Sequence, residues 1–230
     1  MNPIDGILRA ARTMSYFGRL QEVTANNLAN VNTPGFKMDR LTARRPTDLT
    51  YPIPVESLDL SQGGLRTTGR SLDVALEGTG FLVVETEDGE RLSRGGSLRL
   101  DGGGRIVADD GVPVLGASGP IVATGSSVEI EADGTVKSDG QVVDRFRLVR
   151  VAEGTTLVKE GAGRFRLDVG ELLDAGEVIV RQGQLEDPNL DAVGGMIALV
   201  GIQRGYGAAT TALKTMDGVL GSVTTDLARL

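Results

Sequence analysis

Both ends of the chain carry apolar residues at alternating spacings of three and four, whereas stretches of the middle alternate charged and apolar residues. The first pattern runs from residue 4 to 28 and again from residue 199 to 230. It is the heptad pattern of a helix that packs along a partner helix. We therefore predict one long helix over residues 3–31 and another within residues 187–230, and we expect the two to pair with each other.

The heptad positions of the N-terminal helix form a line of contact, or seam, of mostly apolar residues, many of them small. Gln21 is the one polar member of this seam. Its positions are Ile4, Ile7, Ala11, Met14, Gly18, Gln21, Ala25 and Leu28. A helix of this length spans roughly 40 Å, and its small side chains would let a partner helix approach closely. The alternative is an ordinary amphipathic helix that covers a domain core.

The C-terminal seam is apolar or aromatic at every position. It consists of Leu199, Ile202, Tyr206, Ala209, Leu213, Met216, Leu220, Val223, Leu227 and Leu230. We expect the helix to begin with Asp187 as its N-cap and Pro188 in the first helical position. Seven glycines lie within residues 187–230, and each costs a helix interior about 1 kcal/mol relative to alanine. Both terminal helices should therefore be loose in the free monomer and become ordered on assembly.

The middle of the chain is predicted to be mainly antiparallel β structure, built as a sandwich or barrel. Residues 145–151 and 164–167 mostly alternate charged and apolar side chains, as strands with one buried face do. Asp-Gly pairs, which are hairpin signals, begin at residues 88, 101, 110, 133 and 139. Short strands with frequent turns are typical of sandwiches and barrels.

The predicted fold is thus mixed α and β, with a β body between two long heptad helices. Its four segments are 1–37 (N-terminal helix and an Asn-rich turn motif), 38–62 (extended connector), 63–186 (β domain) and 187–230 (C-terminal coiled-coil helix). The connector is assigned from its prolines, which favour extended chain and block helix continuation.

The first helical pattern ends in an unusual run of asparagines: Asn26, Asn27, Asn30 and Asn32. Asparagine is a mediocre helix former that competes for backbone hydrogen bonds, so these amides should have defined partners in this chain or in a neighbouring one. The alternative is a helix end that happens to be rich in asparagine. The next four residues, Thr33-Pro34-Gly35-Phe36, are predicted to form a tight turn, with proline fixing φ and glycine permitting positive φ.

The composition narrows the possible chemistry. The chain has no cysteine and no histidine, which removes thiolate metal sites, the commonest general base and the commonest metal ligand. The net charge of −7 argues against a nucleic-acid partner. No apolar run approaches the roughly 18 residues that a membrane span needs, and no secretory signal is apparent. We expect no cofactor and no metal, and an enzyme that uses paired carboxylates is the weakest alternative.

Several motifs resemble those of the bacterial flagellar rod and hook protein family. They are Ala25-Asn-Asn-Leu-Ala-Asn-Val-Asn-Thr-Pro-Gly-Phe-Lys37, Gln62-Gly-Gly-Leu-Arg-Thr-Thr-Gly69, Leu72-Asp-Val-Ala-Leu76, Gly78-Thr-Gly-Phe81, Gln182-Gly-Gln-Leu-Glu186 and Gln203-Arg-Gly-Tyr206. Together they cover nearly the whole chain in the family's order. Within the family, the total length and the short connector are most similar to the proximal rod members, with the distal rod and hook members as the alternative.

The resemblance implies a structural subunit of the flagellar basal-body rod, which stacks into a tube through its terminal helices and transmits motor torque. It implies export by the flagellar type III apparatus into the periplasm without a cleaved signal. It also implies assembly with copies of itself and with other rod subunits, including the distal rod protein, and no catalysis. A secreted carbohydrate-binding β module is the alternative from a different class, but it leaves both heptad helices unexplained.

Overall fold

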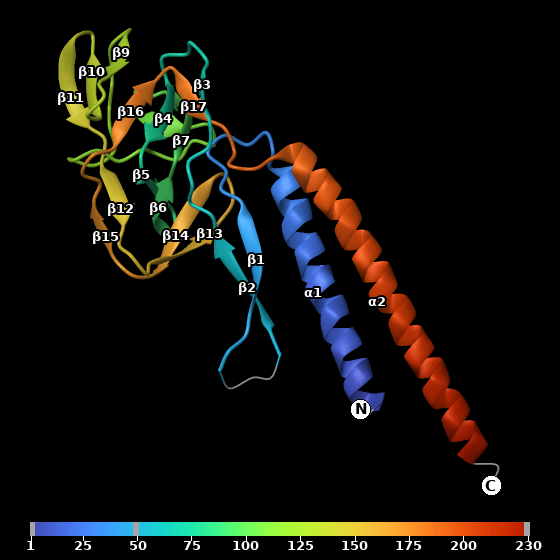
Figure 1. Cartoon of the computed structure of the whole chain (residues 1–230). Helices are drawn as coiled ribbons and strands as arrows, with labels where there is room; N and C mark the ends of the chain where they lie inside the picture. Colours follow the sequence, from blue (N-terminus) through green and yellow to red (C-terminus); the bar gives the residue numbers. More distant parts are fainter. Residues whose placement is uncertain (1–2, 48–50, 228–230) are drawn as a thin grey trace. The chain divides into compact units, whose positions relative to one another are not determined.

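The computed structural model describes residues 3–47 and 51–227 of the chain and divides them into two compact units. The first unit holds the described parts of 1–31, 39–57 and 190–230, and the second holds 32–38 and 58–189. Two long helices at the chain ends and an antiparallel β body are present (Figure 1), so the predicted fold class is confirmed.

The first unit is made of helices α1 (Pro3–Ala29) and α2 (Ala192–Leu227) and strands β1 (Asp39–Arg44) and β2 (Ile53–Leu58). The two strands pair into a small sheet. They lie inside the segment predicted as an extended connector, and this pairing was not predicted. Asn27 fixes the end of α1 to β1, because its side-chain amide exchanges two hydrogen bonds with the backbone of Asp39, at 2.8 and 3.0 Å.

The predicted start of the second helix is wrong by several residues. Helix α2 begins at Ala192, and Asp191 caps it by accepting a hydrogen bond from the Val193 backbone nitrogen at 3.1 Å. Asp187 instead continues the strand region, since its backbone nitrogen donates to the carbonyl of Gly64 at 2.7 Å. A pairing partner far away in sequence thus prevents Asp187 from starting the helix.

The second unit is a β body of short strands. They are β3 (Leu65–Thr67), β4 (Asp73–Glu77), β5 (Gly80–Thr86), β6 (Gly89–Ser93), β7 (Gly95–Leu100), β8 (Ile106–Ala108), β9 (Val128–Ile130), β10 (Thr135–Ser138), β11 (Gln141–Arg145), β12 (Leu148–Val151), β13 (Thr156–Lys159), β14 (Arg164–Val169), β15 (Leu172–Asp174), β16 (Ile179–Gln182) and β17 (Gln184–Glu186). The larger sheets have the orders β13-β14-β6-β5-β12-β15 and β16-β4-β7-β8.

Strand β5 is buried on both faces and therefore organises the core. Leu82 and Val84 belong to a large aliphatic cluster, whereas Phe81 and Val83 belong to a smaller one that includes Phe165. The period of two along a strand sends alternate side chains to opposite faces, so one strand serves both clusters. The rings of Phe81 and Phe165 meet edge to face, with centroids 5.8 Å apart.

The hairpin signals are confirmed where they join strands. Asp139 and Gly140 link β10 to β11 with positive φ at both residues, 48° and 79°, which is the arrangement of a type I′ turn. Asp88 lies in the link between β5 and β6, and Gly89, the first residue of β6, has a φ of 106°. Turn aspartates also accept backbone hydrogen bonds, which couples these turns to pH.

We expect acid to destabilise the β body partly through Asp101, Asp133 and Asp139. The pKa of each carboxyl is lowered, and the largest cause is a hydrogen bond from a backbone N–H group, which belongs to Arg105, Thr135 and Ser127 respectively. A carboxyl with a lowered folded-state pKa contributes stability above its unfolded pKa and loses it as the pH falls through the folded value. Urea midpoints measured from about pH 5 down to about pH 2 should therefore fall.

The matched variant replaces all three aspartates with asparagine, which still accepts the turn hydrogen bonds but does not titrate. Its urea midpoint should fall less steeply over the same pH range. An equally steep fall in the variant would show that these three carboxyls are not responsible.

Candidate assembly site

Helices α1 and α2 pack against each other within the first unit through three close approaches. A Cβ built on Gly205 would lie 2.6 Å from Cζ of Phe17, and one built on Gly195 would lie 2.9 Å from Cδ2 of Leu28. At the other end, a Cβ on Gly6 would lie 3.4 Å from Sδ of Met216. Rising α1 numbers meet falling α2 numbers, so the two helices run antiparallel, and glycines allow their close approach.

The predicted N-terminal seam is only partly used by this pair. Ile7, Met14 and Leu28 are half-buried, whereas Ala11 and Ala25 are exposed. A Cβ on Gly18 would meet nothing within 4 Å. The side chain of Ile4 lies outside the described part of the structure. A row of small residues on α1 is therefore left open.

The C-terminal seam faces α1 along its first half. Ile202 and Ala209 are buried, and Leu199, Leu213 and Leu220 are half-buried. Tyr206 and Met216 are each 39% exposed. The side chains of Val223 and Leu227, and all of Leu230, lie outside the described residues.

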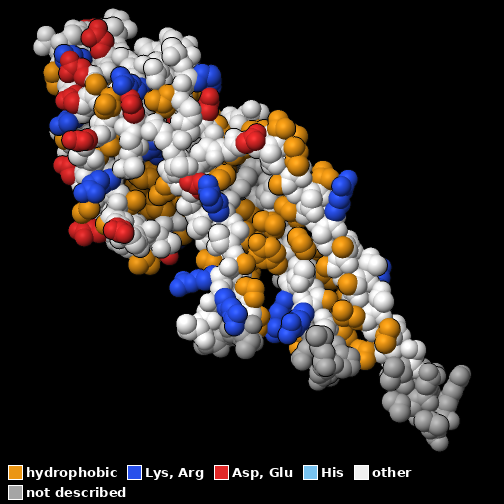
Figure 2. All heavy atoms as spheres, in the orientation of Figure 1, with side chains coloured by type: hydrophobic (Ala, Val, Ile, Leu, Met, Phe, Trp, Pro, Cys, Tyr) orange, Lys and Arg blue, Asp and Glu red, His pale blue; other side chains and the backbone are white. Residues whose placement is uncertain are grey.

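The first turns of α2 carry a second apolar face. Val193, Met196, Ile197 and Val200 are 66%, 59%, 69% and 49% exposed. We call these four residues the α2 stripe. At 3.6 residues per turn, they lie on the side of α2 opposite to the buried Ile202, so they point away from α1. Figure 2 shows hydrophobic side chains on the visible surface of these helices.

The Asn-rich motif divides between the two units. Asn27 holds β1, and Asn30 donates to the backbone carbonyl of Asn26 at 2.9 Å, one turn earlier. Asn26 and Asn32 are exposed. The tight turn that follows is confirmed, because Phe36 donates its backbone N–H to Thr33 at 3.2 Å and Gly35 has a φ of 68°.

The turn leads into a buried cluster of charges in the β body, formed by Lys37, Arg94 and Glu186. Lys37 Nζ donates to Glu186 Oε1 at 2.6 Å, and Arg94 Nε donates to Glu186 Oε2 at 2.9 Å. The three side chains are 1%, 3% and 1% exposed. One carboxylate thus bridges two buried cations, and burial lowers the pKa of Lys37 against the opposing effect of Glu186.

Backbone groups complete the charge cluster. Lys37 Nζ also donates to the carbonyl of Ser61 at 2.6 Å, and Glu186 Oε1 accepts from the Gly63 backbone nitrogen at 2.9 Å. The Arg94 guanidinium donates to further carbonyls, those of Leu76 at 2.9 Å, Gly78 at 2.8 Å and Gly80. Such hydrogen bonds are what a buried charge requires.

Further hydrogen bonds join the segment after α1 to the segment before α2. Gly35 N donates to the Glu186 carbonyl at 2.7 Å. The Asn189 side chain accepts from Met38 N at 2.8 Å and donates to the carbonyl of Asp59 at 2.8 Å. Residues 35–38 follow the first helix and residues 186–189 precede the second, so the β body binds together the two segments from which the terminal helices emerge.

The charge cluster was not predicted as a site. Lys37 and Glu186 each end one of the motifs singled out in the sequence, and Arg94 stands between two strands. The only sequence signal was that charged residues closed two otherwise polar or apolar motifs.

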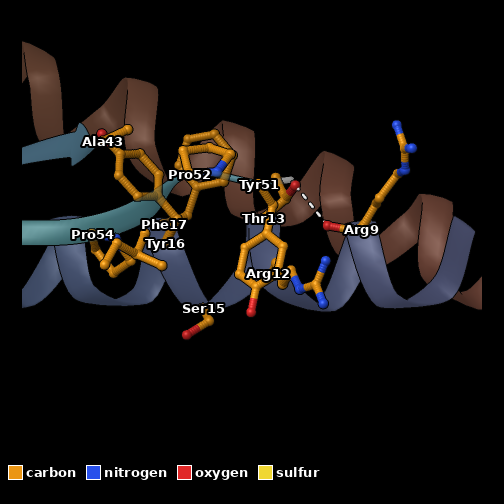
Figure 3. A pocket seen from close by; sticks show the side chains of 11 residues that line it. Arg9, Arg12, Thr13, Ser15, Tyr16, Phe17, Ala43, Tyr51, Pro52 and Pro54 are labelled. Atoms are coloured by element: carbon orange, nitrogen blue, oxygen red, sulfur yellow. Dashed lines mark hydrogen bonds between the residues drawn. The ribbon is translucent and has the colours of Figure 1, made fainter. Parts of the chain in front are cut away.

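A groove of about 600 Å³ lies between α1 and the β1–β2 sheet (Figure 3). Its walls are mainly aromatic and proline side chains, those of Tyr16, Phe17, Tyr51, Pro52 and Pro54. Arg9 and Arg12 also line it, and the Arg12 guanidinium carbon lies 3.6 Å from the centroid of the Tyr51 ring. The groove therefore combines an apolar lining with positive charge.

No group of three or more acidic, cysteine or histidine side chains among the described residues is arranged to hold a metal ion. No described helix combines the length and the apolar character that crossing a membrane requires.

Three family models match the chain. Residues 7–37 match "Flagella basal body rod protein", residues 75–142 match "Flagellar hook protein FlgE/F/G D1 domain", and residues 181–226 match "Flagellar basal body rod FlgEFG protein C-terminal". The three matches fall on α1 with the turn motif, on the β body, and on α2 with the strand before it.

Individual proteins that are similar to this chain are also flagellar basal-body rod proteins. The flagellar basal-body rod protein FlgF of Escherichia coli (strain K12) is 34% identical over 223 residues, covering 86% of this chain and 88% of the relative. FlgF of Caulobacter vibrioides is 30% identical over 212 residues, with 85% of each chain covered. The rod protein FlgG of Bacillus subtilis (strain 168) is 29% identical over 245 residues, covering 90% and 93%.

Proposed function

The chain belongs to the flagellar basal-body rod protein family, and on this premise we propose that it builds the rod by packing its terminal helices against those of neighbouring rod subunits. It is a structural subunit of the flagellar basal body, as its FlgF and FlgG relatives are. The resulting tube transmits motor torque to the parts of the flagellum beyond it.

The observation that carries this proposal is the two-faced character of α2. One face packs against α1, while the α2 stripe on the other face has four large apolar side chains that are between 49% and 69% exposed. Contiguous exposed apolar surface marks an interaction site. The open row on α1, with Ala11, Gly18 and Ala25, supplies the flat surface that a closely packed neighbour needs.

The assembly residues follow from the two seams and the turn motif. On the N-terminal side they are Ile4, Ile7, Ala11, Met14, Ala25, Asn26, Asn27, Leu28, Asn30, Asn32, Pro34, Gly35 and Phe36. On the C-terminal side they are Leu199, Ile202, Tyr206, Leu213, Met216, Leu220, Val223 and Leu227. Within this proposal the exposed amides of Asn26 and Asn32 bond to neighbouring subunits, and the role is that of a proximal rod protein next to the distal rod protein.

The same proposal covers export and chemistry. The chain leaves the cytoplasm through the flagellar type III apparatus, reaches the periplasm with its N-terminal residues retained, and catalyses no reaction. Intact-mass measurement of the chain extracted from basal bodies tests the first part, because a cleaved signal would remove N-terminal residues.

Leu213→Asp should abolish incorporation into the rod and therefore swimming. Leu213 is half-buried in the α2 seam, and a carboxylate without a partner in a packed helix seam costs several kcal/mol. The measurement is the amount of the chain in purified basal bodies, together with swimming in soft agar. Leu213→Met, which keeps the volume and the apolar character, is the matched control. Normal swimming with Leu213→Asp would refute assembly through the helices.

A further inference from the structure

The groove between α1 and the β1–β2 sheet has no described side chain of this chain filling it, although its walls are suited to apolar contact. Aromatic and proline side chains form those walls, and Arg9 and Arg12 add positive charge. At about 600 Å³ it is large enough for several aliphatic side chains. An occupant with apolar side chains beside a carboxylate would match this lining in both apolar character and charge.

The α2 stripe has that chemistry. Its members stand at positions i, i+3, i+4 and i+7, the spacing by which a helix places apolar anchors in a groove. The exposed side chain of Asp191 lies one residue before Ala192, where α2 begins, and two residues before Val193, the first member of the α2 stripe. Among the described residues of the first unit, these four side chains are the most exposed run of large apolar groups.

We propose that the groove of one copy receives the α2 stripe of a second copy, an inference that rests on the proposed rod function. Both surfaces belong to the first unit, but the stripe faces away from α1, whereas the groove lies on the side of α1 that meets β1 and β2. They therefore meet only between molecules. Different surfaces on the two partners make a heterologous contact, which generates a helical filament when the rotation between copies does not close a ring.

Charge supports this pairing over a pairing of two stripes. Arg9 and Arg12 at the groove match Asp191 at the head of the stripe, whereas two α2 stripes facing each other would leave the guanidinium groups without an acidic partner from the second copy. Opposite charges across an interface set its register and orientation.

The absence of cysteine from the sequence makes the contact directly testable. Ser15 and Ala43 are exposed residues that line the groove from α1 and β1. The full-length double variant Ser15→Cys with Ile197→Cys is expressed in place of the natural chain, and basal bodies are treated with a short bismaleimide. We expect a ladder of products at multiples of the chain mass, which a repeating contact between different surfaces produces.

The control is Ser15→Cys with Val219→Cys, because Val219 is 58% exposed on the same helix but lies outside the α2 stripe. It should remain monomeric. A second test pair, Ala43→Cys with Val200→Cys, covers the event that the first variant fails to fold. An equal ladder in the control, dimers alone, or products whose mass includes a different protein would overturn the inference.

The experiment also separates this inference from the function on which it rests. If the variants are present in basal bodies and support swimming but neither test pair gives a ladder, the rod function stands and the groove contact is wrong. If the unmodified chain itself is absent from basal bodies, the proposed function fails.

Discussion

Replacing Glu186 with glutamine is expected to lower the free energy of unfolding by about 3–5 kcal/mol, the cost typical of removing one partner from a buried ion pair. The Glu186 carboxylate bridges Lys37 and Arg94, and all three side chains are almost completely buried. Glutamine keeps the shape but leaves both cations without that carboxylate. Since a domain is usually stable by only about 5–15 kcal/mol, the loss is large. Urea denaturation of the full-length protein measures it.

Glu77→Gln is the matched control for this substitution. Glu77 pairs with Arg181 at 2.7 Å, but both side chains are 44% exposed. Water screens such a pair, so its removal should cost about 1 kcal/mol or less. If the two variants lost equal stability, the buried cluster would have no special role.

The charge cluster also bears on how the rod subunit transmits force. In the proposed rod, torque that passes along the chain from α1 or α2 enters the β body at residues 35–38 or at residues 186–189 respectively. Lys37 and Glu186 bond directly across these two segments, and Gly35 adds a backbone hydrogen bond to Glu186. The two segments are thus held as one piece, and we expect Glu186→Gln to weaken swimming even where the chain still assembles.

Local signals explain what the sequence predicted well. The helices, the turn at Thr33–Phe36 and the Asp-Gly hairpins each depend on residues a few positions apart. The charge cluster was not predictable in that way, because Lys37 and Glu186 are 149 positions apart. Nothing in the local sequence distinguishes a buried lysine and glutamate from solvated ones.

The contact line between α1 and α2 was only partly predictable from the heptad pattern, for a different reason. The close approaches of α1 involve Gly6, Phe17 and Leu28, which are spaced by 11 residues, or about three turns of a straight helix. Only Leu28 belongs to the predicted heptad seam. A heptad line drifts around a straight helix relative to a contact line of this kind, which is why Ala11 and Ala25 stay exposed and remain available to other subunits.

Gly205→Leu is expected to break the helix pair in the isolated protein. A Cβ at this position would already lie 2.6 Å from Cζ and 2.7 Å from Cε1 of Phe17. The rest of a leucine side chain must force the helices apart, and overpacking of this kind costs about 1–3 kcal/mol or more. Thermal melting followed by circular dichroism at the helix band should show the helical signal lost at a lower temperature.

Gly207→Leu separates this packing effect from helix propensity, because leucine favours a helix over glycine by a similar amount at both positions. A Cβ on Gly207 would meet nothing within 4 Å, so this variant should melt at a higher temperature than the natural chain. Combining Gly205→Leu with Phe17→Ala removes the ring that clashes and should recover part of the loss. If Gly205→Leu melted as Gly207→Leu does, the close approach of α1 and α2 at this point would be wrong, and with it the antiparallel register that leaves the α2 stripe free for a neighbouring subunit.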